Sequence, residues 1–285
     1  MMCGEESPGE KCWLGIDFSG NCRMWRTQTK KSNVWVAKVS GKPDGPVLKS
    51  LKIVHELPGE GTPFLRLTNL LKSRHFAAAA IDAPFSVPGA CVPRDEHKRL
   101  LELVAEIQRP KHCPFPAAQD FVCRVLAGRA LKGKKPLRET ERYWQKQGVN
   151  VRSTLWAGPR GGAAMTSACL TLLHETGCAI WPWAETIANG LLVEAFPAAQ
   201  LRHWKIQHDG YNGNDYKASS TRRELVQFVS ARITLDDPFR EKLEASADAL
   251  DAVLCAFAAI AVTTGKLPDW LSGPLDSEGR IAVHE

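Results

Sequence analysis

Two short apolar runs that each end on an aspartate constrain the fold of this chain more than any other feature. Residues 13–17 lead through apolar side chains to Asp17 and stop at a Ser-Gly turn, and residues 76–82 lead to Asp82, where Ala83-Pro84 ends regular pairing. Both patterns predict buried strands. A charge at the end of an apolar strand is costly to bury without compensation, and ligand crevices form at the carboxyl ends of strands in α/β sheets. We therefore expect the two acids to converge on one site.

The other predicted elements are typical of an α/β protein. Residues 33–40 and 49–56 alternate apolar and polar side chains around the turn-rich segment 41–46, which predicts a hairpin. Helical spacing and apolar runs predict the remaining elements, namely helices over 62–73, 162–176, 221–233 and 246–263, and strands over 178–183 and 191–196.

Residues 88–162 differ in character and are expected to form a helical insertion. Several prolines separate helix-like pieces such as 95–108 and 117–126. The segment after residue 265 is rich in Pro and Gly, which is typical of an irregular terminus. We therefore expect an N-terminal tail (1–12), one domain (13–265) that contains the insertion, and a C-terminal tail (266–285).

Composition places the chain among ordinary globular proteins. Of its 285 residues, 44% are hydrophobic and 24% are charged, which is enough to bury a sizeable core. The first eleven residues carry no hydrophobic signal core, and no apolar run approaches the length of a membrane span, so we expect a cytoplasmic protein without membrane contact. Nine cysteines without paired spacing argue against a disulfide framework and against a zinc site.

The positive charge favours an acidic partner such as nucleic acid. The formal net charge is +6, and the densest basic stretch lies in the insertion, with Tyr143 and Trp144 between its cations: Lys132, Lys134, Lys135, Arg138, Arg142 and Lys146. These residues are expected either to guide a nucleic acid or to form a solvated helix face. Candidate substrate-binding residues are Ser19, Arg138, Lys217 and Arg222, although a hydrated surface explains the last two equally well.

A second pair of acids lies on the last predicted helix. Asp248 and Asp251 are three residues apart, so both lie on one face. Their neighbours are apolar and no Lys or Arg lies within a turn, which is unusual for a surface helix. Asp248 also suits the positive N-terminal end of the helix, whereas Asp251 has no such explanation.

A cluster of Asp17, Asp82, Asp248 and Asp251 would require a cation. Four carboxylates repel one another and raise one another's pKa unless a divalent ion neutralises them. Oxygen-only ligands favour Mg²⁺ or Mn²⁺ as the cofactor. Two such ions, about 3.5–4 Å apart, can activate a water and stabilise the leaving oxygen in phosphodiester cleavage. These residues are therefore the candidate catalytic and metal-binding acids.

Four segments resemble the predicted RNase H-like nucleases of the domain of unknown function 429. The segments are Gly15–Gly20, Ala80–Phe85, Val193–Pro197 and Ala247–Val253. The last of them also resembles the final helix of RuvC-type resolvases, whose last two metal-binding acids share its Asp-x-x-Asp spacing. The resemblance extends over residues 13 to about 262 and implies an RNase H-like mixed sheet flanked by helices. It implies that the four aspartates bind metal and adds Glu194 as a further acid, whereas the following Phe196-Pro197 suggests an edge where Glu194 is solvated.

Three functions are compatible with the sequence. The leading one is a metal-dependent nuclease that hydrolyses phosphodiester bonds of DNA or RNA by a two-metal-ion mechanism. An ATP-handling protein of the actin and sugar-kinase fold also carries a first-strand acid, although its Gly- and Thr-rich phosphate hairpins are not evident around residues 21–31. The third is a non-catalytic nucleic-acid-binding scaffold. The sequence does not distinguish DNA from RNA and does not set an oligomeric state.

Overall fold

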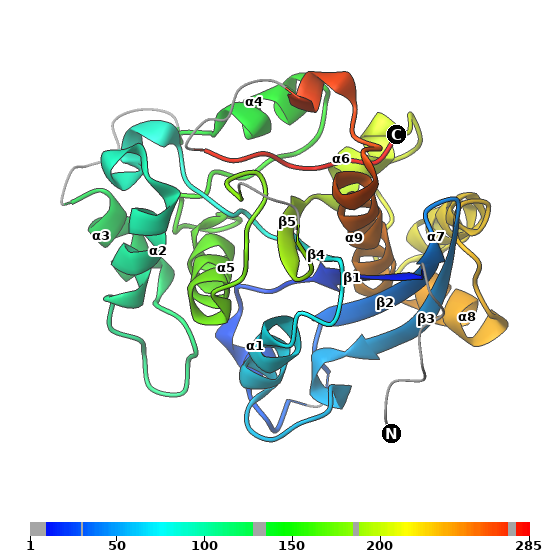
Figure 1. Cartoon of the computed structure of the whole chain (residues 1–285), viewed down its shortest axis with the longest axis horizontal. Helices are drawn as coiled ribbons and strands as arrows, with labels where there is room; N and C mark the ends of the chain where they lie inside the picture. Colours follow the sequence, from blue (N-terminus) through cyan, green and yellow to red (C-terminus); the bar gives the residue numbers. More distant parts are fainter. Residues whose placement is uncertain (1–9, 30, 128–134, 185–187, 273–277) are drawn as a thin grey trace.

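The chain folds around one mixed five-stranded sheet, as the computed structural model shows for residues 10–29, 31–127, 135–184, 188–272 and 278–285. The strands are β1 (Lys11–Asp17), β2 (Trp35–Lys42), β3 (Gly45–Ile53), β4 (Ala78–Asp82) and β5 (Leu191–Ala195). Their order is β3-β2-β1-β4-β5. Strand β2 runs antiparallel to both of its neighbours, β1 and β3, whereas β4 and β5 run parallel to β1. An α/β fold with a mixed sheet is thus confirmed (Figure 1).

The predicted strands are present except for the one expected over 178–183, and the hairpin differs from its predicted bounds. The hairpin is confirmed, but its strands extend through Gly41 and Pro46, because these residues pair with each other across the tight turn at 43–44. The strand expected over 178–183 is wrong, since only Ile180 forms an isolated bridge, to Leu192. Pro182 follows at once and has no N–H to donate to a ladder.

Capping residues mark the ends of several helices. The described residues form α1 (Pro63–Lys72), α2 (His97–Ala105), α3 (Ala118–Val125), α4 (Glu139–Lys146), α5 (Ala163–Thr176), α6 (Pro197–His203), α7 (Tyr216–Ser230), α8 (Asp237–Ala245) and α9 (Ala247–Thr264). The Thr62 side chain caps α1, and Gly177 ends α5 in the left-handed conformation, both as the sequence predicts. Helix α7 begins a turn earlier than expected because the Asp215 side chain accepts from Ala218 N at 2.8 Å. Helices α6 and α8 were not predicted.

The alternation of side chains along β1 and β4 builds two cores, one on each face of the sheet. Leu14 and Ile81 belong to the first core, which α1, α5 and the insertion helices cover. Trp13 and Ala80 belong to the second, which α7, α8 and α9 cover. Figure 1 shows α9 close to β1 and β4, and α2 and α3 beside α5, away from the strands. The sheet is therefore buried on both faces, as its apolar strands require.

Helix α9 approaches β1 closely because residue 15 has no side chain. A Cβ atom at Gly15 would lie 2.0 Å from the carbonyl oxygen of Ala252 and 2.5 Å from the nitrogen of Ala256. Contact between backbones at this distance brings the first turns of α9 beside the end of β1. By length and composition α9 is apolar enough to cross a membrane, with a mean hydropathy of 1.7 over 18 residues, so the expectation that no apolar run approaches this length is wrong. In the structure, 72% of those residues are buried inside the protein.

The C-terminal segment packs against the domain instead of lying free. Ile281 and Val283 are buried beside Trp144 of α4, and the backbone N–H of Ala282 donates to the carbonyl oxygen of Glu194 at 3.0 Å. Figure 1 shows this red segment running alongside α4 and α6. Parts of both expected tails, residues 1–9 and 273–277, lie outside the described residues.

Candidate metal centre

Asp17 and Asp82 lie at the ends of neighbouring parallel strands. The two strands pair in register, with Asp17 opposite Asp82. Because side chains alternate along a strand, Asp17 lies on the same face as Trp13, and Asp82 on the same face as Ala80. Both carboxylates therefore lie on the face that α9 covers, and the convergence expected from the sequence is present.

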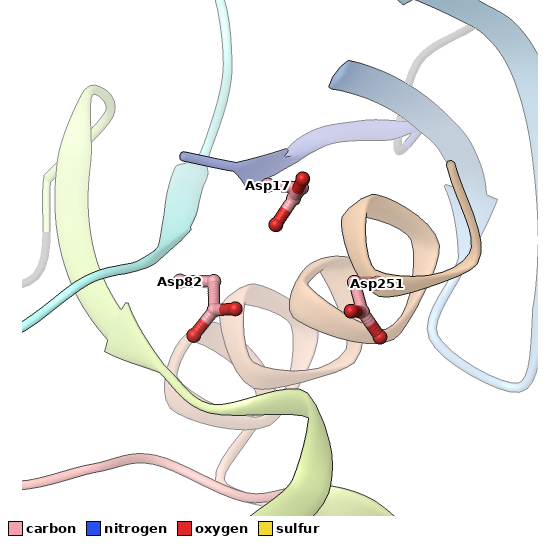
Figure 2. Close-up of side chains that lie close together, drawn as sticks. All are labelled: Asp17, Asp82 and Asp251. Carbon is pink, nitrogen blue, oxygen red and sulfur yellow. The ribbon is translucent and has the colours of Figure 1, made fainter. Parts of the chain in front are cut away.

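Helix α9 supplies a third carboxylate, that of Asp251. Ser246 begins the helix, and its hydroxyl accepts from Ala249 N at 3.2 Å, so Asp251 falls in the second turn. One oxygen each of Asp17, Asp82 and Asp251 lie within 4.8 Å of one another. Figure 2 shows the three side chains pointing into one space from β1, β4 and α9. We call these residues the Asp triad.

Burial and mutual repulsion disfavour the charged forms of the Asp triad. Burial, followed by repulsion from Asp251, Asp82 and Asp248, raises the pKa of Asp17 well above its usual range. Burial, followed by repulsion from Glu194, raises the pKa of Asp82 to about 7, although the positive charge of Arg152 opposes this. Burial also raises the pKa of Asp251. A bound cation would therefore stabilise the charged carboxylates, which burial and mutual repulsion disfavour.

The donor chemistry of the Asp triad fits a hard divalent cation. Among the residues that the structure describes, no Lys, Arg or His forms an ion pair with any of the three carboxylates. The three ligand atoms that the Asp triad offers are all carboxylate oxygens, which Mg²⁺ and Mn²⁺ prefer. The residues present are thus suited to hold such an ion, because no described basic side chain forms an ion pair with them.

Tyr211 fixes the orientation of Asp251. Its hydroxyl donates to Asp251 Oδ1 at 2.8 Å in a buried setting. The loop that carries Tyr211 is held by Arg222, which donates to the carbonyl oxygens of Tyr211 at 2.6 Å and Gly213 at 2.7 Å, and to that of Glu244 at 2.9 Å. Arg222 is only 5% exposed, so its donors serve the loop and not a hydrated surface. Hydrogen bonds of this kind orient metal ligands from outside the coordination sphere.

Asp248 lies beside the Asp triad but is not a member of it. It occupies the first turn of α9, where the helix dipole favours an acid, and it is partly buried. Its charge raises the pKa values of Asp17 and Asp251, so it is near both. It is absent from the group of described residues whose oxygens lie within 4.8 Å of one another. The fourth predicted ligand therefore borders the site.

Glu194 points away from the Asp triad because of strand parity. In the register of β4 and β5, Glu194 lies opposite Ile81, one residue out of step with Asp82, so its side chain lies on the other face of the sheet. It is 2% exposed, so the solvated edge is a wrong expectation. Its carboxylate accepts from Phe85 N at 2.9 Å and from both terminal nitrogens of Arg138, at 2.8 and 2.5 Å.

Arg138 is buried with acidic partners on both sides. It is 1% exposed, and its Nε donates to Glu141 Oε1 at 3.0 Å while its terminal nitrogens bind Glu194. The solvated helix face considered for this basic stretch is therefore wrong at Arg138, which begins α4 inside the protein. Lys132 and Lys134 lie outside the described residues, and Lys146 is exposed on α4.

The two other candidate substrate-binding residues, Ser19 and Lys217, do not line the cavity described next. Ser19 is 5% exposed; its hydroxyl accepts from Asn21 N at 3.2 Å, and its carbonyl oxygen accepts from the Trp25 indole N–H at 2.8 Å. These bonds shape the turn after β1. Lys217 is exposed in the first turn of α7.

A cavity of about 380 Å³ lies beside Asp82 and Asp251. One wall comes from residues 148–152 and 161–162 of the insertion together with Met165 of α5, and the other from the loop 208–212 that carries Tyr211. His208 Nε2 lies 3.4 Å from the carbonyl oxygen of Gly148 and connects the two walls. Residues 148–152 lie in the expected helical insertion but form no helix. Neither Arg152 nor Tyr211 is among the predicted site residues, because no local sequence pattern marks either one.

Comparison with known proteins identifies a family for this chain. The family model described as "Protein of unknown function (DUF429)" matches residues 62–274, which is 213 of the 285 residues. The matched region contains Asp82, Glu194 and Asp251, while Asp17 precedes it. No curated protein and no solved structure matches the chain.

Proposed function

This chain belongs to the DUF429 family, whose description names no activity, and from the site itself we propose that it is a metal-dependent nuclease. The observation that carries the proposal is the Asp triad, in which one carboxylate oxygen of each residue lies within 4.8 Å of the other two. No basic side chain in the described part of the chain forms an ion pair with these three carboxylates. An unpaired buried charge cluster costs stability, so a function that uses it is the best account of its presence.

In this proposal, Asp17, Asp82 and Asp251 hold divalent ions, and Asp248 completes the shell from the first turn of α9. The ions, when bound, would supply Lewis-acid activation of a water and charge neutralisation of the leaving oxygen. Tyr211 keeps Asp251 in one orientation through its 2.8 Å hydrogen bond. The rigid pairing of β1 with β4 sets the positions of the two strand acids.

The architecture agrees with an RNase H-like assignment, but the proposed activity does not rest on the fold. A mixed sheet flanked by helices, with a helical insertion between β4 and β5, is what the resemblance to RNase H-like nucleases implies. One fold hosts many functions, so the activity rests on the site.

The test is strand cleavage by the purified full chain with Mg²⁺ or Mn²⁺. A panel of single-stranded, duplex and branched DNA and RNA is incubated beside ATP, with Asp17→Asn and Asp251→Asn as site variants. Asp120→Asn, an exposed acid on α3, is the matched control. We expect the site variants to lose at least about 100-fold in cleavage rate, because even outer partners of metal ligands contribute 10- to 100-fold.

A readout without turnover accompanies the assay. Titration calorimetry with Mn²⁺ alone should show binding to the wild-type chain and the control, and weakened binding to both site variants. Cleavage that survives both substitutions would refute the proposal. ATP turnover without strand cleavage would favour an ATP-handling protein, and saturable nucleic-acid binding without cleavage under either metal would favour a scaffold.

A further inference from the structure

The carboxylates of the candidate centre lie in a recess. Asp17 is 7% exposed and Asp251 is 9% exposed, and the adjoining cavity of about 380 Å³ is near the lower end of small-molecule sites, which span about 300–1,000 Å³. A phosphate within a duplex is flanked by paired nucleotides, which a recess of this size does not admit together. Enzymes that modify a base and cannot reach their target atom inside a duplex act on single strands or on a nucleotide extruded from the stack, and we apply the same steric reasoning to a recessed phosphodiester site.

Arg152 is the available cation of this cavity. Its side chain is exposed and lines the cavity, and the described residues offer it neither a hydrogen bond nor an ion pair. Asp82 of the Asp triad lines the same cavity as Arg152. Arg138 also lines the cavity, but Glu141 and Glu194 occupy its donors. A phosphate that enters beside the Asp triad therefore meets Arg152 as its unengaged partner.

The rest of the wall combines apolar and polar groups. Val151, Met165 and Phe196 present apolar surface, and the exposed Asn150 and Asn212 present amide donors and acceptors. A nucleotide has a flat base that stacks on apolar or aromatic side chains, and polar edges that amides can bind. The cavity thus provides for the base as well as for the phosphate.

We infer that this cavity binds one unpaired nucleotide of a nucleic-acid strand, with its phosphate on Arg152 beside the Asp triad and its base against Val151, Met165 and Phe196. The inference rests on the proposed nuclease function and narrows its substrate class to single-stranded ends or extruded nucleotides. Arg152 acts here as a substrate-binding residue.

The test measures binding separately from cleavage. Fluorescence anisotropy follows a labelled single-stranded DNA oligonucleotide and the same strand in a blunt duplex, with Ca²⁺ in place of Mg²⁺; unlabelled deoxyadenosine monophosphate serves as a competitor. The variants are Arg152→Ala and Arg152→Lys, and Lys98→Ala is the matched control, because it removes the same charge from an exposed site of the insertion, on α2, outside the cavity. Circular dichroism checks that each variant folds.

We expect the single strand to bind more tightly than the duplex. Arg152→Ala should weaken single-strand binding by about ten-fold or more, because hydrogen bonds to charged groups contribute about 1.5–3 kcal/mol. Arg152→Lys should keep part of the affinity, and Lys98→Ala should change it by less than about two-fold, as general charge screening predicts.

Three outcomes would overturn the inference. They are equal loss of affinity in Arg152→Ala and Lys98→Ala, duplex binding as tight as single-strand binding, and no competition by the mononucleotide even in large excess. These outcomes are distinct from failure of the proposed function. Normal single-strand binding without cleavage under any metal would refute the nuclease and leave the binding site, whereas cleavage of duplex that is unaffected by Arg152→Ala would refute the binding site alone.

Discussion

Replacement of Asp82 by Asn is expected to stabilise the metal-free protein. The pKa of Asp82 is raised to about 7, first by burial and then by repulsion from Glu194, against an ordinary value of 3.8. As the pH rises from about 4 to about 7, the unfolded chain loses this proton and the folded chain keeps it, so the free energy of unfolding falls across that window. Above pH 7 the loss is complete and amounts to about 4 kcal/mol.

This magnitude sets the size of the expected effect. The neutral Asn side chain escapes the loss, so Asp82→Asn should raise the free energy of unfolding by up to about 4 kcal/mol at pH 8, but by only about 2 kcal/mol at pH 5. These are upper limits, because Asp82 is partly exposed and solvent screens its charge. For a chain of this length, 4 kcal/mol corresponds to a rise in Tm of about 8 °C.

The assay is urea and thermal unfolding in EDTA at pH 5 and pH 8, for the wild type, for Asp82→Asn and for the exposed control Asp120→Asn. The control should change stability by less than about 0.5 kcal/mol at either pH. Addition of Mn²⁺ at pH 8 should stabilise the wild type by mass action and the variant far less. Destabilisation by Asp82→Asn at pH 8, or a gain that is the same at both pH values, would refute the reasoning about the buried charge.

Three further predictions concern the surroundings of the site. Tyr211→Phe removes the hydroxyl that donates to Asp251 at 2.8 Å, and calorimetry should show Mn²⁺ affinity reduced by about 10- to 100-fold with the fold intact; unchanged affinity would count against a positioning role. Glu194→Gln removes one of the two ion partners of the buried Arg138 guanidinium and leaves only Glu141, so it should cost up to about 3–5 kcal/mol in urea unfolding, whereas a cost below 1 kcal/mol would contradict this account. Gly15→Ala places a Cβ 2.0 Å from a backbone oxygen of α9 and should lower stability by about 1–3 kcal/mol or more; a Tm equal to that of the wild type would show that α9 can shift freely.

The sequence by itself determined the elements that carry their own local signals. The strand ends at Asp17 and Asp82 could be predicted because an apolar run, an acid and a turn follow one another along the chain. The last helix could be predicted as well, since Ser246 and Gly265 cap a long apolar repeat that contains Asp251. Such patterns survive without tertiary context because periodicity and capping act over only a few residues.

Only the tertiary structure decided which acids meet. Asp82 and Glu194 both end apolar strands, but the register of β4 with β5 sends Glu194 to the opposite face, where Arg138 neutralises it. Register depends on pairing between distant segments, and a shift of one residue exchanges the two faces.

The supporting residues of the site were likewise beyond the reach of sequence patterns. Tyr211 and Arg152 lie in loops; Tyr211 donates a hydrogen bond to Asp251, 40 residues further along the chain, and Arg152 lines the same cavity as Asp82, 70 residues before it. Local sequence encodes helix and strand through short-range sterics and hydrogen bonding. The charge, burial and orientation of a buried carboxylate depend instead on the groups that folding brings around it.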